Sequence, residues 1–229
     1  HRYAPAESWK KPRGHASIVL ETDCDVVVCF YASEVELRTD SSFSQRGLGR
    51  RLGPDLTNSD VDWEDLRLRV ASYRAREDTP DPAEPDRGRR REFTLEELLL
   101  TQWVASGIGN VYKSEVLFLE RLHPLTPLRE VRDPILLRAY EHAHRLLRAN
   151  LRGGPRVTRP VADGRGTLWV YGRSGSPCFE CGTPILRRRT GWGQRTTFWC
   201  PTCQASELDR LRPSRRLHPR GSGGESPSY

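Results

Sequence analysis

The stretch Leu99-Leu-Thr-Gln-Trp-Val-Ala-Ser-Gly-Ile-Gly-Asn-Val-Tyr-Lys-Ser-Glu-Val-Leu-Phe118 decides the fold of this 229-residue chain. Apolar residues occur on both sides of Gly107 and Gly109, and glycines placed so close together interrupt a helix. The stretch therefore predicts two helices joined by a tight turn.

The flanking residues predict where these and two further helices lie. Thr94 followed three positions later by Glu97 has the spacing of a capping box, which predicts a helix capped by Thr94. The helix after the turn is expected from about 111 to 121. Amphipathic patterns predict two more helices, from about 59 to 75 and from 133 to 151.

The N-terminal part has a β pattern instead. Residues 16 to 38 are rich in β-branched side chains on both sides of an Asp-rich turn, which predicts antiparallel strands. Because few strands are available to close a sheet, we expect the remnant of a larger β domain. Cys24 and Cys29 are predicted to be buried apolar residues of these strands and not ligands.

Composition divides the chain further. We predict a β-domain remnant over 1–55, a helical domain over 56–160, a Gly-rich loop with a cysteine hairpin over 161–204, and a disordered tail over 205–229. Within the helical domain, residues 76 to 92 are rich in Pro, acids and Arg, which is typical of a mobile loop.

Four cysteines give the strongest local chemical signal. Cys178-Phe-Glu-Cys181 and Cys200-Pro-Thr-Cys203 are two Cys-x-x-Cys motifs with eighteen residues between them. This spacing favours one structural Zn²⁺ held by Cys178, Cys181, Cys200 and Cys203, because a hairpin brings the four thiolates to tetrahedral positions. A pair of disulfides or a redox site is the alternative.

The C-terminal third is basic. Residues 151 to 229 contain 14 Arg, no Lys and five acidic residues, a net charge of +9, which leaves −2 for the remainder of a chain that carries +7 in all. Such a patch favours a polyanion, and a solvated basic surface is the alternative. Basic, hydroxyl and aromatic residues lie between the two motifs on an expected β ribbon: Arg187, Arg188, Arg189, Trp192, Gln194, Arg195, Thr196, Thr197 and Phe198.

The ends of the chain and its hydropathy give expectations about location. No run of 18 apolar residues and no signal-peptide pattern occurs, so we expect a cytoplasmic protein with no membrane partner. Met is absent and residue 1 is His, from which we expect a fragment of a longer protein.

The turn at Gly107-Ile-Gly-Asn110 is a candidate phosphate site. Glycines allow a ligand to approach the backbone, and the Asn110 amide lies beside the free N–H groups of the following helix. The alternative is an ordinary helix–helix turn in which Asn110 only caps the helix.

Three segments together resemble one known family. The stretch 99–118 with Leu122-His-Pro124, the segment Val170–Cys178 and the segment Gln194–Gln204 resemble the formamidopyrimidine-DNA glycosylase and endonuclease VIII family, and Leu52-Gly-Pro-Asp55 fits the start of its helical domain. The resemblance covers roughly residues 1 to 204 and is nearer the endonuclease VIII-like branch. It implies an α+β fold: a partial antiparallel β-sandwich domain, then a helix-two-turns-helix domain with a β-hairpin zinc finger of four cysteines.

The resemblance also implies roles for individual residues. Asn110 would contact a phosphate near the lesion, and Arg195 would hold phosphates beside an everted nucleotide and act in the last strand-cleavage step. The DNA-binding residues implied are Asn110, Lys113, Tyr171, Arg173, Gln194 and Arg195. Phe43 and Gln45 are weak candidates for filling the gap that the everted base leaves, and an ordinary loop phenylalanine is the alternative.

Family members use an N-terminal Pro amine as nucleophile with an adjacent Glu, and this sequence opens His1-Arg2-Tyr3 instead. The resemblance thus implies a base-excision-repair glycosylase and abasic-site lyase for oxidised bases, of which this chain supplies DNA binding. We expect a monomer, associated with a bacterial nucleoid, that binds damaged double-stranded or single-stranded DNA. The alternatives are a non-catalytic damage sensor or scaffold, and a zinc-ribbon module that binds proteins.

Overall fold

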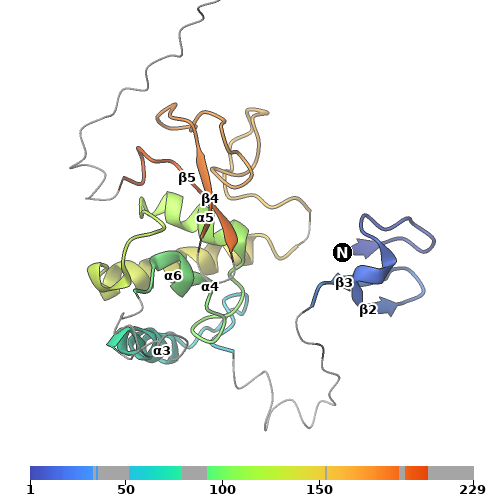
Figure 1. The fold of residues 1–229 in the computed structure, drawn as a ribbon, viewed down its shortest axis with the longest axis horizontal. Helices are drawn as coiled ribbons and strands as arrows, with labels where there is room; N and C mark the ends of the chain where they lie inside the picture. The colour runs from blue at the N-terminus through green and yellow to red at the C-terminus, as the bar shows by residue number, and fades with distance from the viewer. Residues whose placement is uncertain (33–34, 36–51, 79–91, 153, 191–193, 206–229) are drawn as a thin grey trace, which may run out of the picture. The chain divides into compact units, whose positions relative to one another are not determined.

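A computed structural model describes residues 1–32, 35, 52–78, 92–152, 154–190 and 194–205. The chain separates into two compact units, residues 1–50 and 51–229 (Figure 1). Residues 206–229 of the predicted tail, most of the loop over 76–92, and Phe43 and Gln45 lie outside the described residues. Within the described part, no helix is both long and apolar enough to cross a lipid bilayer.

The first unit is a small antiparallel sheet. Its strand order is β1-β3-β2, formed by β1 (Arg2–Tyr3), β2 (Ala16–Glu21) and β3 (Val26–Phe30), with a 3₁₀ turn, η1 (Arg13–His15), before β2. Glu21 pairs with Val26 across the predicted turn. The prediction for the two cysteines is wrong, because Cys24 lies in that turn and both Cys24 and Cys29 are exposed within this chain.

The second unit begins with α3 (Trp63–Ala75), which is followed by η2 (Arg76–Asp78). Helix α3 starts later than predicted, because Asp62 is its N-cap and accepts a hydrogen bond from the amide of Asp65 at 2.8 Å. The capping box at Thr94 is confirmed and opens α4 (Leu95–Leu100).

The two remaining helices lie close to their predicted bounds. Helix α5 (Asn110–Leu119) follows the glycine turn, and α6 (Asp133–Ala149) follows η4 (Leu128–Glu130). The side chain of Asn150 ends α6 by bonding the carbonyl of Leu146 at 2.8 Å, two residues before the predicted end. Together these helices bury the larger of two apolar cores, which includes Leu56, Leu66, Val70, Leu98, Val116, Leu117, Leu136 and Tyr140.

The C-terminal part of the unit is the predicted hairpin of β4 (Leu186–Thr190) and β5 (Arg195–Trp199). Its base has a core of its own, made by Phe118, Val170, Cys178, Ile185, Phe198 and Cys200. Phe118 belongs to α5, so the hairpin is attached to the helix that follows the glycine turn. The predicted α+β class, with mixed helices and antiparallel sheets, is confirmed.

Candidate metal centre and nucleic-acid interface

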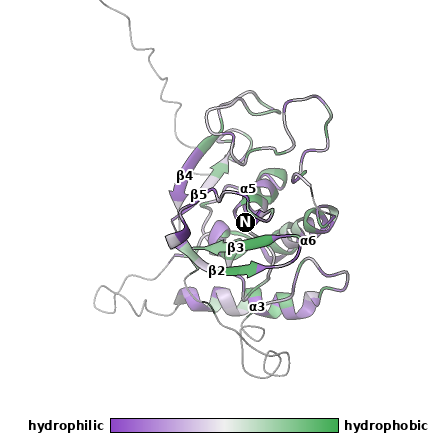
Figure 2. Cartoon of the chain, turned by 90° about the vertical axis from the view of Figure 1, so that its right-hand side faces the viewer, coloured by the Kyte–Doolittle hydropathy of each residue, from purple (hydrophilic) through white to green (hydrophobic). Residues whose placement is uncertain are grey.

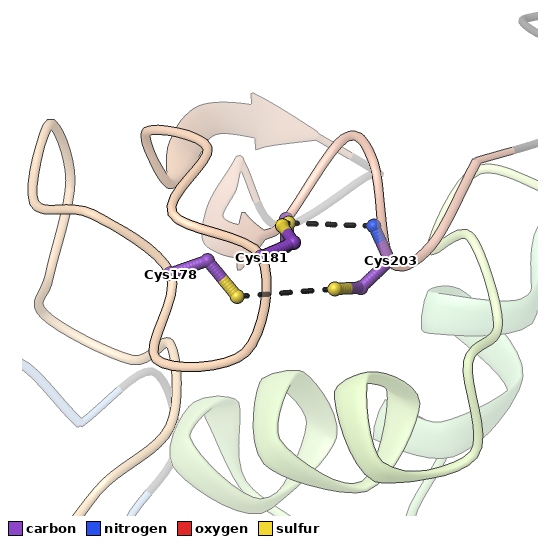
Figure 3. A group of neighbouring side chains, drawn as sticks. Cys178, Cys181 and Cys203 are labelled. Carbon is purple, nitrogen blue, oxygen red and sulfur yellow. Dashed lines mark hydrogen bonds between the residues drawn. The ribbon is translucent and has the colours of Figure 1, made fainter.

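Four cysteine side chains converge at the base of the hairpin. Their Sγ atoms all lie within 4.8 Å of one another. The Sγ atoms of Cys178 and Cys203 are 3.9 Å apart (Figure 3). Those of Cys181 and Cys200 are 3.4 Å apart. Four sulfurs at about 2.3 Å from a central zinc ion lie about 3.8 Å from each other in a tetrahedron. The donor set therefore fits one tetrahedral metal ion.

Backbone hydrogen bonds shape both cysteine motifs. In the first, the amide of Cys178 donates to the carbonyl of Thr183 at 2.8 Å, and Gly182 turns the chain with φ of 74°. In the second, the amide of Cys203 points at Cys200 Sγ, 3.4 Å away. Such N–H groups stabilise thiolate ligands, because they place positive charge next to sulfur.

Gln204 joins the second motif to the helical domain. Its Oε1 accepts from the amide of Cys200 at 2.9 Å, and its Nε2 donates to the carbonyl of Leu122 at 2.9 Å. Gln204 is completely buried, so both bonds are shielded from water. The metal centre is therefore held against the end of α5.

Arg195 lies at the start of β5 and is exposed. Gln194, which precedes it, is also exposed and has a left-handed backbone with φ of 44°. The neighbouring residues 191–193 lie outside the described part of the chain. The structure thus presents Arg195 and Gln194 at the end of the hairpin remote from the cysteines, where an exposed guanidinium can meet a phosphate.

Lys113 is placed differently from its prediction. Its side chain is fully buried, and its Nζ donates to Thr197 Oγ1 at 2.6 Å and lies 3.6 Å from Glu96 Oε2. Burial lowers the pKa of Lys113, the charge of Glu96 acts to raise it, and the nearby charge of Arg195 adds to the lowering. In this structure Lys113 is therefore a buried link between α5 and the hairpin and is not available to DNA.

A second contact continues this link along the same two elements. The amide of Phe198 points at Ser114 Oγ, 3.4 Å away, so the two contacts follow the same chain order along β5 and α5. Toward their N-terminal ends, β5 begins at Arg195 and α5 begins at Asn110. The shared direction places these two residues toward the same edge of the second unit.

The glycine turn before α5 is built around Gln102. Its Nε2 donates to the carbonyl of Ile108 at 2.9 Å, and its Oε1 faces the amide of Gly107 at 3.2 Å. Gly107 has φ of 108°, a backbone that favours glycine. Asn110 is the first residue of α5, and its Oδ1 is buried without a hydrogen-bond partner among the described residues.

Glu115 is a site residue that sequence reasoning missed. Its buried carboxylate accepts the amides of Trp169, Val170 and Tyr171 at 2.7, 2.9 and 2.8 Å, and the hydroxyl of Thr158. Three backbone amides on one carboxylate form an anion cradle. Glu115 thereby holds the loop before the cysteine hairpin against α5. In the sequence, the one signal for this role was the position of Glu115 five residues after Asn110 on the same short helix.

Two further predicted DNA contacts lie in this loop. The Tyr171 ring packs against Phe198 with centroids 5.0 Å apart, and Tyr171 is half-buried. The Arg173 guanidinium lies 3.4 Å from the centroid of the Phe179 ring and donates to the carbonyls of Trp169 and Pro177. Burial lowers the pKa of Arg173. Both residues support the base of the hairpin, and any contact that they make with DNA stays a prediction.

Comparison with known proteins agrees with this geometry. The family model for the H2TH domain of formamidopyrimidine-DNA glycosylase matches residues 80–160. A probable endonuclease 8 2 of Streptomyces coelicolor is 35% identical over 221 residues, which is 95% of this chain and 72% of that protein. The chain belongs to the formamidopyrimidine-DNA glycosylase and endonuclease VIII family.

Other family members match over a shorter part of their length. The DNA-(apurinic or apyrimidinic site) lyase Nei2 of Mycolicibacterium smegmatis is 39% identical over 68% of this chain and 53% of its own length. Against most of its curated relatives, the chain therefore spans about half of their length.

Solved structures of the family show the same fold. The Lactococcus lactis Fpg in complex with DNA containing an abasic site matches with a TM-score of 0.59 and 20% identity, over 90% of this chain and 70% of that one. MutM (Fpg) from Thermus thermophilus matches with a TM-score of 0.54 and 26% identity, over 85% of this chain and 70% of that one.

Proposed function

We propose that this chain grips damaged DNA as part of a base-excision-repair glycosylase and abasic-site lyase that acts on oxidised bases. Asn110 and Arg195 bind phosphates of the lesion-bearing strand, and Arg195 also acts in the final strand cleavage. The observation that carries the proposal is the aligned packing of α5 and β5, which directs these two residues toward one edge. Its relatives, a probable endonuclease 8 and an abasic-site lyase, support the same activity.

The metal in this proposal is one structural zinc ion. The spacing of the four sulfurs supports zinc, and with all four positions taken by cysteine the ion has no open position for a substrate. When bound, it supplies rigidity at the base of the hairpin. The chain's own residues then present Arg195 with little loss of side-chain and loop freedom on binding.

The base-removal step needs an amine nucleophile beside a carboxyl group. This sequence opens His1-Arg2-Tyr3 and not Pro-Glu. We propose that the contacts made by Asn110 and Arg195 bind a lesion and do not themselves excise a base. The contribution of this chain is to neutralise phosphates and to hold the strand in register.

The test is a binding titration of the zinc-loaded chain on two labelled duplexes, one with an abasic-site analogue and one undamaged. We expect tighter binding to the first, and an affinity that falls with salt, because phosphate contacts release counterions. A salt-independent affinity, or none at all, would contradict the proposal.

The same samples test whether the chain excises a base. A duplex with an oxidised base is incubated with the chain and sodium borohydride, which traps a Schiff base. We expect no trapped complex, and a covalent adduct would show that the chain carries its own nucleophile.

A further inference from the structure

Strand β4 carries a run of positive charge that the contacts described so far do not use. Arg187, Arg188 and Arg189 are consecutive and exposed, and Figure 2 shows β4 as a strongly hydrophilic strand. Among the described residues, none of the three forms an ion pair with an acidic side chain. Exposed guanidinium groups on neighbouring positions of one strand repel one another, and a bound anion relieves that repulsion.

These arginines surround a recess. Arg187, Arg188, Arg189 and Thr196 line an open cavity of about 290 Å³. Its walls offer guanidinium and hydroxyl donors and no carboxylate, so the recess suits a phosphate group and not an apolar ligand.

The pairing of the hairpin places three of the four residues that line the recess on one face. Arg187 lies opposite Phe198 and Arg189 lies opposite Thr196, so the side chains of Arg187, Arg189 and Thr196 share a face. Phe198 packs against Tyr171 at the base of that face.

Arg195 belongs to the other face. It pairs with Thr190, and Thr197 lies two residues further along the same strand, so Arg195 and Thr197 share a face. On this face Thr197 contacts Lys113 of α5, and on the other face Phe198 belongs to the same apolar cluster as Phe118 of α5. The hairpin therefore carries basic side chains on both of its faces.

We propose that Arg187 and Arg189 bind backbone phosphates of the DNA strand complementary to the one that Arg195 holds. The inference rests on the proposed function, because it places the hairpin on DNA. A two-stranded ribbon at a groove has one sugar-phosphate strand on each side, so its two faces meet different strands. Thr196 adds a hydroxyl donor to the same contact.

The test compares a duplex with its lesion strand alone. The double variant Arg187→Ala/Arg189→Ala of the zinc-loaded chain is titrated onto a labelled duplex with an abasic-site analogue, and onto the same strand without its complement. We expect roughly tenfold weaker duplex binding and a salt slope smaller by about 2, one unit for each lost phosphate contact. Single-strand affinity stays unchanged, whereas Arg195→Ala weakens binding to both.

Controls separate charge from folding. Arg187→Lys/Arg189→Lys keeps both charges and should retain most of the salt slope, and zinc content should stay at one ion in every variant. Equal losses on duplex and single strand would overturn the inference, because both arginines would then contact the lesion strand. No loss on either would overturn it as well. If Arg195→Ala also lost nothing, the proposed function itself would fail.

Discussion

Among the described glycines, Gly53 has the least room for a side chain. A Cβ atom at this position would lie 2.2 Å from the carbonyl oxygen of Val104 and 2.8 Å from the amide nitrogen of Ala105. The amide of Gly53 also donates to the carbonyl of Gln102 at 2.8 Å. The chain thus enters the helical domain pressed against the backbone just before the glycine turn, and both neighbours are backbone atoms that cannot swing away.

Gly53→Ala should therefore lower the free energy of unfolding by about 3 kcal/mol, the upper part of the range for overpacking. Urea denaturation of the zinc-loaded chain measures it. Gly109→Ala is the matched control, because a Cβ there meets no atom within 4 Å, and it should cost less than about 1 kcal/mol. Equal costs in the two variants would show that the close approach at Gly53 is not real.

Helix α5 and strand β5 are joined by a buried polar cluster of Lys113, Glu96 and Thr197. Glu96 is 2% exposed and accepts a hydrogen bond from the hydroxyl of Thr197. The Thr190 hydroxyl, 2.9 Å from that of Thr197, extends the cluster across the hairpin. A buried carboxylate of this kind depends on its cation, because removing one partner leaves an uncompensated charge.

Lys113→Met should therefore cost about 3 to 5 kcal/mol, and Glu96→Leu in the same chain should recover a large part of that cost. A double-mutant cycle by urea denaturation measures the coupling. Arg67→Ala breaks the exposed pair with Glu64, 3.4 Å apart, and should cost below about 1 kcal/mol. Additive losses at Lys113 and Glu96 would contradict the cluster.

The pH dependence of stability offers an independent readout of the same lysine. Burial lowers the folded-state pKa of Lys113 below its ordinary value of 10.5. The unfolded chain therefore binds this proton more tightly than the folded chain does. As a result, Lys113 makes the free energy of unfolding rise as the pH increases from the folded-state pKa toward 10.5. That contribution should be absent from Lys113→Met.

The elements differ in how far the sequence predicts them. The helices and the hairpin follow from local signals, such as the capping box at Thr94 and the two Cys-x-x-Cys motifs. The burial of Lys113 does not, because its partner Thr197 is 84 residues away and nothing near Lys113 in sequence announces it. The exposure of Cys24 was equally hard to predict, because only the pairing of β2 with β3 shows that Cys24 lies in the turn and not in a strand.

At the scale of the molecule, the helical core and the hairpin core are separate apolar clusters. The hairpin core is small and includes Cys178 and Cys200, two members of the four-cysteine cluster. We therefore expect metal binding to stabilise the hairpin far more than the helices.

Removing zinc with a chelator should release one ion per chain and abolish DNA binding, while most of the helical circular-dichroism signal remains. Cys200→Ser should have the same effect without a chelator, whereas Cys29→Ser, at an exposed position outside the cluster, should have none. Loss of the whole helical signal on chelation would mean that the two cores are not independent.

The central claim is that the metal-held hairpin and the glycine turn act on the same stretch of sugar-phosphate backbone. A double-mutant cycle with Asn110→Ala and Arg195→Ala, titrated on a duplex with an abasic-site analogue, tests it most directly. We expect Arg195→Ala to weaken binding by about 1 to 3 kcal/mol and Asn110→Ala to cost less, with both variants zinc-loaded and folded. Unchanged affinity in either folded variant would contradict it.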